Sequence, residues 1–175
     1  MGEWNGGVKS ECPAIAELKA ALLEAVPILG ADPKKIGTVR DDGSRHTAGL
    51  AMDIMLDSRD SIEKSVADQI IEAVINVHPK MRWSDLIYTD WSGGKPVYFH
   101  IPGMPPFGGP KGMLKKNPTS ESLGSQHKNH IHIDWWAFND KEWPPHARTK
   151  GFKTALVAEL TKTPQWLVDY MKTIP

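Results

Sequence analysis

Apolar residues recur every three or four positions in two long stretches of the chain, a spacing typical of amphipathic helices. The first predicted helix runs from Cys12 to Leu29 and is closed by Pro27 and Gly30. The second runs from Ser58 to Val77, with Ser61 as a candidate cap. Its apolar stripe consists of Ile62, Val66, Ile70, Val74 and Val77. Both stripes predict helices that pack on a core.

Shorter apolar or alternating runs predict strands between and after these helices. The expected strands are Ile36 to Arg40, Leu50 to Leu56, Trp83 to Trp91, Lys95 to Ile101 and the stretch His127 to Trp136. The third and fourth would form a hairpin. Two short helices, Phe152 to Thr161 and Pro164 to Lys172, are expected near the end of the chain. The stretch Gly103 to Gln126 has little periodicity and is expected to be a loop that flanks His127, as a lid or groove wall.

The order helix, strands, helix, hairpin, strand and helices predicts an α+β fold, with a small, mainly antiparallel sheet and helices packed around it. The chain has 175 residues and a mass of 19.4 kDa. That size predicts one domain covering residues 1–175, large enough for a core of its own.

The composition of the chain limits the classes of binding partner that we expect. Lys plus Arg and Asp plus Glu both number 21, so the charge gives no reason to expect a nucleic-acid or acidic-membrane partner. Cys12 is the single cysteine, which excludes an internal disulfide. No apolar run is long enough to predict a membrane span. The first residues have no basic segment followed by an apolar one, so we expect synthesis in the cytoplasm without an ordinary secretory signal.

The first stretch with candidate chemistry holds His46 and Asp53, which are seven positions apart. On a helix this spacing separates the two side chains by about 10 Å along the axis, and on a strand they point to opposite faces. A shared role therefore requires a bend, for which Gly49 offers a place. Asp53 lies in an apolar run, where a carboxylate is costly to bury unless it is paired or bound to a metal.

The second such stretch places His130, His132 and Asp134 on one face of a strand and Ile131, Ile133 and Trp135 on the other. Two imidazoles at positions i and i+2 stand side by side. His46, Asp53 and one of these histidines would supply two nitrogens and one oxygen. This donor set suits catalytic zinc with water in the fourth position.

The pattern Ser44-x-His46-x-x-Gly49-x-Ala51-x-Asp53, followed by His130-x-His132, resembles the LAS metallopeptidases. This group includes lysostaphin, D-Ala-D-Ala carboxypeptidases, penicillin-insensitive murein endopeptidases and the metal-binding domain of sonic hedgehog. The resemblance spans roughly Thr38 to Trp136. It implies Zn²⁺ as the cofactor, with His46, Asp53 and His132 as its ligands.

One departure from the group bears on the reaction. D-Ala-D-Ala carboxypeptidases carry a catalytic Glu three residues before the last His ligand, where this chain has Asn129. The pattern His127-x-x-His130-x-His132 resembles the murein endopeptidases instead, in which a His adjoins the metal-bound water. The resemblance therefore favours an endopeptidase with His130 as general acid and base. His127 is a second candidate, for stabilising the tetrahedral intermediate or orienting a ligand.

Two further residues have alternative interpretations. Arg40 resembles the arginine that precedes the metal motif in many of these peptidases, near the substrate carbonyl or carboxylate; alternatively it is a solvated side chain beside two aspartates. Asp134 is a candidate for a carboxylate that orients a metal-binding imidazole, but we interpret it as an ordinary polar residue at a strand end.

The expected function is a zinc peptidase that cleaves the peptide part of peptidoglycan, with those peptides as its partner. A phage lysin or a secreted antibacterial toxin would reach the cell wall without a signal, and a toxin would bring an immunity or delivery protein as a partner. The alternative is an inactive, metal-stabilised binding module like that of sonic hedgehog. A third interpretation treats the histidines as unrelated core and surface groups.

Overall fold

The computed structural model describes residues 10–41, 44–91, 95–100, 114–116, 129–135, 143 and 145–162. Its strands are β1 (Ile36–Gly37), β2 (Ala51–Ile54), β3 (Asp85–Trp91), β4 (Lys95–His100), β5 (Leu114–Lys116) and β6 (Ile131–Asp134). They form one six-stranded sheet in the order β1-β2-β6-β3-β4-β5, and all neighbouring pairs are antiparallel. The expected hairpin is present as β3 and β4.

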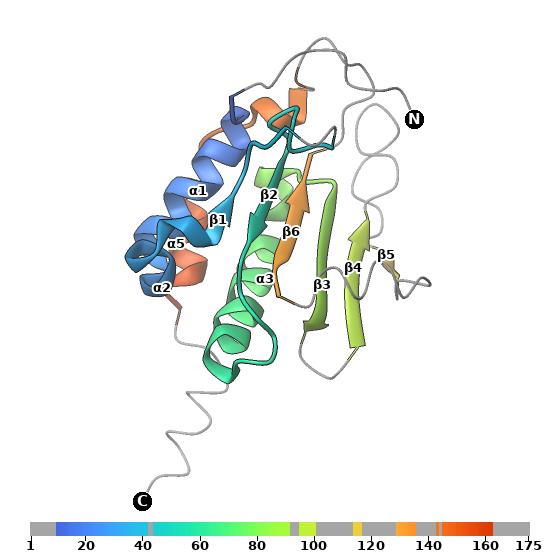
Figure 1. Ribbon diagram of the computed structural model, residues 1–175. Coiled ribbons are helices and arrows are strands. Elements are labelled where there is room, and N and C mark those ends of the chain that lie inside the picture. Colours follow the sequence, from blue (N-terminus) through green and yellow to red (C-terminus); the bar gives the residue numbers. More distant parts are fainter. Residues whose placement is uncertain are drawn as a thin grey trace, which may run out of the picture.

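The helices are α1 (Pro13–Ala25), α2 (Pro27–Ala31), α3 (Ser61–Met81) and α5 (Lys153–Leu160), with short 3₁₀ helices at η1 (Pro33–Lys35) and η2 (Pro145–Arg148). Helix α3 lies behind the central strands in Figure 1. Helix α5 packs against both α1 and α3. The α+β class and the mainly antiparallel sheet predicted from the sequence are confirmed.

The expected single helix from Cys12 to Leu29 is wrong at Pro27. Val26 has an extended backbone (φ −112°, ψ 102°) and ends α1, because the residue before a proline is disfavoured in the helical region. Pro27 then opens the separate helix α2, where its missing N–H costs no hydrogen bond.

Both ends of the second helix also differ from the prediction. The N-cap is Asp60 rather than Ser61, since its carboxylate accepts hydrogen bonds from the backbone N–H groups of residues 62 and 63, both at 2.9 Å. At the other end α3 continues past Pro79 to Met81, and Arg82 closes it with a φ of 58°. Ile62 was expected in the apolar stripe but is 69% exposed, because it lies in the solvent-facing first turn.

Cross-strand pairing gives the sheet two chemically different faces. Asp53 of β2 lies opposite His132 of β6, while the adjacent residue Met52 lies opposite Ile133. Because side chains alternate along a strand, polar residues share one face and apolar residues the other. The apolar face joins the helix-covered core through Met52, Ile54, Leu86, Ile131 and Ile133. The polar face carries Asp53, Asp85, His132 and Asp134.

Some predictions fall partly or wholly outside the described residues. The stretch Gly103 to Gln126, expected to be a loop, contains β5, which pairs with β4. The rest of that stretch, the helix expected at Pro164 to Lys172, and His127 lie outside the described residues. No helix in the described part of the chain is long and apolar enough to cross a membrane.

Candidate metal centre

His46 lies in a compact turn that immediately precedes β2. Within it the N–H of Gly49 donates to the carbonyl of His46 at 2.9 Å, and the N–H of Leu50 donates to the carbonyl of Arg45 at 3.0 Å. Gly49 has a φ of +66°, in the left-handed region that glycine adopts without strain. The predicted bend between His46 and Asp53 is therefore present, and Gly49 makes it. The carbonyl of Gly49 also accepts the N–H of Cys12 at 2.9 Å, which joins the turn to the start of α1.

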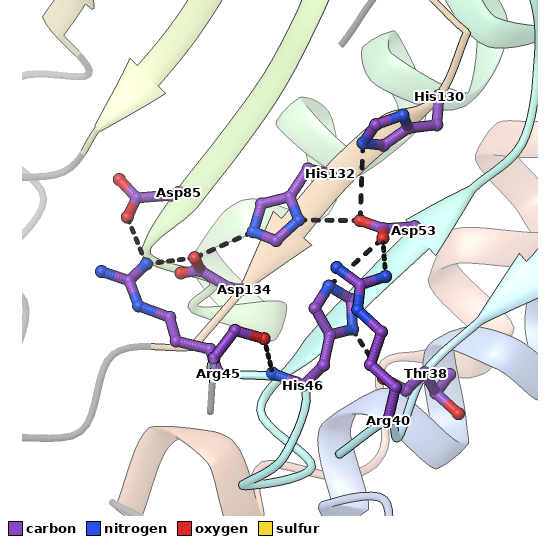
Figure 2. A network of polar contacts seen from close by, with 10 residues as sticks. Thr38, Arg40, Arg45, His46, Asp53, Asp85, His130, His132 and Asp134 are labelled. Atoms are coloured by element: carbon purple, nitrogen blue, oxygen red, sulfur yellow. Dashed lines mark hydrogen bonds and ion pairs between the residues drawn. The ribbon is translucent and has the colours of Figure 1, made fainter. Parts of the chain in front are cut away.

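The turn and two neighbouring strands bring His46, Asp53 and His132 together. One ligand atom from each lies within 4.8 Å of the other two. His46 is 1% exposed and Asp53 is 5% exposed, so both are held in place by their surroundings. Figure 2 shows the three side chains pointing toward one another, His46 from the turn, Asp53 from β2 and His132 from β6. The cluster expected from the two sequence motifs is thus formed.

His46 is oriented with one ring nitrogen toward Asp53. Its Nδ1 lies 2.6 Å from the carbonyl oxygen of Thr38, which can only accept, so Nδ1 carries the proton. The Nε2 atom is then a lone-pair donor. It is buried without a hydrogen-bond partner and lies 3.3 Å from Oδ2 of Asp53. A buried acceptor in this state is the form in which an imidazole binds a metal.

His132 lies between two carboxylates. Its Nδ1 is 2.8 Å from Oδ1 of Asp53, and its Nε2 is 3.2 Å from Oδ2 of Asp134. Burial alone would lower the pKa of the imidazole, but the hydrogen bonds and negative charges of Asp134 and Asp53 raise it to about 9. A metal at this position would therefore replace a proton on Nδ1.

Asp53 is the centre of the cluster. Burial would raise the pKa of its carboxyl group, but the hydrogen bond and the charge of His132 outweigh burial and hold that pKa well below its usual range. Arg40 also reaches it, with Nη1 at 2.5 Å from Oδ2 of Asp53. The structure thus places Arg40 at the cluster, and its side chain remains 51% exposed.

The donor set fits a divalent metal of the zinc type. Two imidazole nitrogens and a carboxylate oxygen are the ligands of a common class of catalytic zinc site. Ligand atoms of tetrahedral zinc lie about 3.3 Å apart, given bonds of about 2.0 Å. His46 Nε2 and Asp53 Oδ2 lie at 3.3 Å. Elsewhere in the described residues no other group of histidine, cysteine and carboxylate side chains offers three converging ligand atoms.

His130 lies beside the cluster rather than in it. Its Nε2 is 3.8 Å from Oδ1 of Asp53, and its side chain is 16% exposed. Its Nδ1 is 2.9 Å from the side-chain oxygen of Asn129. With the proton on Nδ1, the Nε2 lone pair faces the cluster. Asn129 thus orients the neighbouring imidazole.

The interpretation of Asp134 as an ordinary polar residue at a strand end is wrong. It is 1% exposed and contacts His132 from the side away from Asp53. Arg45 donates to Asp134 and also to Asp85, neither of which could be connected with Arg45 from the sequence. Asp85 lies 40 positions from Arg45, and no local spacing relates the two.

Comparison with protein-family models, with curated proteins and with solved structures gives no match to this chain. Function is therefore inferred from the chemistry of the cluster and its surroundings.

Proposed function

We propose that this chain is a zinc-dependent peptidase of the LAS type that hydrolyses amide bonds in the peptide part of peptidoglycan. The observation that carries the proposal is the convergence of His46, Asp53 and His132, whose ligand atoms lie within 4.8 Å of one another. The resemblance of the two sequence motifs to those of the LAS metallopeptidases supplies the choice of zinc and the class of substrate.

Three protein ligands leave a zinc ion one open position, where it would lower the pKa of a water molecule to about 7 and polarise the substrate carbonyl. The chain's own residues prepare this site in two ways. Thr38 fixes the proton of His46 on Nδ1, and Asp134 contacts Nε2 of His132, the ring nitrogen that does not face Asp53. The burial of His46 and Asp53 limits the reorganisation that binding would require.

His130 is the proposed general acid and base. With Nδ1 held by Asn129, its Nε2 can accept a proton from the attacking water and later deliver it to the leaving amine. Asn129 has no ionisable group and cannot take over this role. His127 stays a candidate for stabilising the tetrahedral intermediate, outside the described residues.

Arg40 is the proposed contact for a substrate carbonyl or carboxylate. It lies against Asp53 yet is half exposed, so its guanidinium group borders both the cluster and solvent. A planar guanidinium can bind a carboxylate or carbonyl oxygen through more than one N–H group.

The absence of a carboxylate at Asn129 favours an endopeptidase over a carboxypeptidase. The biological setting proposed is the cell wall in the periplasm, reached as a phage lysin or as a delivered antibacterial effector with an immunity or delivery protein. Expression with and without an added export signal tests this setting. Harm to the host in the exported form alone supports it, and equal harm from both forms contradicts it.

The activity is tested by incubating the purified protein with isolated sacculi and identifying released muropeptides by mass spectrometry. We expect soluble products from the zinc-loaded protein, none after chelation, and recovery when zinc is restored. His130→Ala is the matched control, since it should keep the metal and lose the products. Binding to sacculi without release would indicate the metal-stabilised binding module instead. Iron in place of zinc in the purified protein would contradict the proposal.

A further inference from the structure

We propose that Arg45 is a positioning residue for the metal centre: through Asp134 it keeps His132 turned so that Nδ1 faces Asp53. This inference rests on the metal-binding part of the proposed function and on no step of the hydrolysis. Figure 2 shows the chain of contacts from Asp85 through Arg45 and Asp134 to His132.

Arg45 joins two buried carboxylates with one nitrogen. Its Nη1 donates to Oδ2 of Asp85 at 2.7 Å and also to Oδ2 of Asp134. The side chains of Asp85 and Asp134 are 4% and 1% exposed, whereas that of Arg45 is 38% exposed. The guanidinium therefore lies over the two carboxylates at the border with solvent.

The sheet itself creates the need for this cation. Asp85 of β3 and Asp134 of β6 are direct cross-strand partners, so their side chains stand next to each other on the polar face. Two neighbouring buried carboxylates repel each other and are costly to bury without a compensating charge. Arg45 supplies that charge from the turn, which is not part of either strand.

The same contact fixes the role of Asp134 toward His132. Oδ2 of Asp134, the oxygen that Arg45 contacts, lies 3.2 Å from Nε2 of His132. Oδ2 is the oxygen that accepts from the guanidinium of Arg45, and Nε2 of His132 donates to that same oxygen. The lone pair of the neutral imidazole is then on Nδ1, which lies 2.8 Å from Oδ1 of Asp53.

The backbone holds Arg45 in this position. Its carbonyl accepts the N–H of Leu50 at 3.0 Å, and the carbonyl of Leu50 accepts the N–H of Trp135 at 2.9 Å. The turn is thus hydrogen-bonded to the chain immediately after β6. Arg45 and His46 are adjacent, so one turn supplies a metal ligand and also the residue that orients the ligand on β6.

The competing interpretation is that Arg45 only neutralises buried charge. Two variants separate the two roles. Arg45→Lys keeps the positive charge, but its ammonium group ends a shorter side chain and cannot place a donor where Nη1 of Arg45 meets both carboxylates. Asp85→Asn is the matched control, because Asp85 pairs with the same guanidinium, whereas Asp134 is the carboxylate that contacts His132.

The experiment measures zinc affinity of the folded proteins by competition with a chelator, stability of the zinc-free proteins by urea denaturation, and the protonated nitrogen of His132 by NMR of its imidazole nitrogens. For Arg45→Lys we expect zinc affinity to fall about 10- to 100-fold, the usual range for a residue that orients a ligand. The zinc-loaded wild type should carry its His132 proton on Nε2, and the variant should show a different or mixed state. Asp85→Asn should keep zinc affinity within about threefold.

Equal zinc affinity in Arg45→Lys and wild type, or an equal loss in Arg45→Lys and Asp85→Asn, would overturn the inference. If Arg45→Lys does not fold, Asp134→Asn replaces it, with the same expected loss and the same refuting result. A wild type that binds no zinc would overturn the metal centre as a whole. Because none of these measurements needs turnover, a zinc-loaded but inactive wild type would overturn the peptidase proposal alone.

Discussion

Replacing Gly49 by alanine tests whether the bend between His46 and Asp53 depends on glycine. A Cβ atom at this position would lie 2.1 Å from the carbonyl oxygen of Ser10 and 3.0 Å from its carbonyl carbon. Both atoms belong to the backbone that precedes α1, so no side-chain rotation relieves the contact. The φ of +66° is a second, separate obstacle for any residue with a Cβ.

The two obstacles add. Holding an L-residue in the left-handed region costs about 1–2 kcal/mol. Contacts of a Cβ under 3.0 Å are essentially never seen, so the backbone at Ser10 or Gly49 must move by about 0.9 Å from the 2.1 Å contact. Overpacking that forces backbone shifts costs about 1–3 kcal/mol. We therefore expect Gly49→Ala to lower the free energy of unfolding by about 2–5 kcal/mol, a large part of the total for most domains.

Thermal and urea unfolding of the zinc-free protein measure this loss, and two other glycines serve as controls. For a chain of 175 residues the loss corresponds to a fall in Tm of about 4–20 °C. Gly151 has a φ of +87° but no atom within 4 Å of an added Cβ, so Gly151→Ala should cost the conformational part alone, about 1–2 kcal/mol. Gly37 has ordinary φ and its Cβ would be 4.0 Å from the nearest atom, so Gly37→Ala should be nearly neutral.

Zinc affinity supplies a second readout. Movement of the turn displaces His46 relative to Asp53, so Gly49→Ala should bind zinc more weakly than Gly151→Ala. If Gly49→Ala proves no more destabilising than Gly151→Ala, the close approach to Ser10 is not a constraint. If it loses stability but binds zinc like the wild type, the bend does not set the ligand geometry.

Four further predictions concern the metal centre and the fold. Ala at His46, Asp53 or His132 should abolish stoichiometric zinc, and chelation should lower the Tm of the wild type but not of these variants; full zinc occupancy in Asp53→Ala would refute the ligand set. His130→Ala should keep zinc while turnover on sacculi falls about 10²- to 10⁴-fold, and a wild-type rate would refute the proposed base. The pKa of His132 is raised to about 9 in the zinc-free protein, so zinc must displace a proton below that pH. Zinc affinity should therefore rise with pH and level off above about 9. Calorimetry in buffers of different ionisation enthalpy measures the released proton. The protonated His132 stabilises the zinc-free fold fully below the unfolded pKa of about 6.5, and this contribution is lost as pH rises through about 9. Asp60→Ala should cost about 1 kcal/mol in urea unfolding through loss of the cap of α3, and an unchanged midpoint would contradict the cap.

The sequence is sufficient to predict the features of the site that depend on a local pattern of residues. Alternation along residues 130–134 predicts which histidines face the site, because side-chain direction in a strand depends on position alone. The predicted bend at Gly49 follows from the same reasoning, since no regular element brings His46 and Asp53 together. Both features appear in the structure, with Asp53 directly opposite His132.

The sequence was insufficient where a contact is long-range or made by backbone. The carbonyl of Thr38 that orients His46 has no signature, since every residue carries one. The role of Asp134 cannot be predicted from the sequence, because its burial depends on the neighbouring strand and on Arg45. The predicted cap of the helix α3 differs from the observed one for a related reason. Asp60 and Ser61 can both cap a helix, and backbone geometry over a single residue decides between them.

The position of β6 in the sheet has a consequence for the order in which the protein is assembled. β6 lies between β2 and β3, and it joins the pair β1-β2 to the group β3-β4-β5 (Figure 1). In sequence, however, it follows all five of them. A growing polypeptide on the ribosome therefore exposes the two halves before the strand that unites them exists.

Until residues 131–134 emerge, β2 and β3 each lack the neighbour they have in the finished sheet. Unpaired strands of this kind are prone to pair with the wrong partner. The proposed ligand His132 lies on the strand that completes the sheet, so the proposed ligand set would be complete only after the two halves have joined. Arrested nascent chains that end before Ile131 should accordingly remain sensitive to protease with or without zinc, whereas chains extended well beyond Trp135 should become resistant, and more so with zinc.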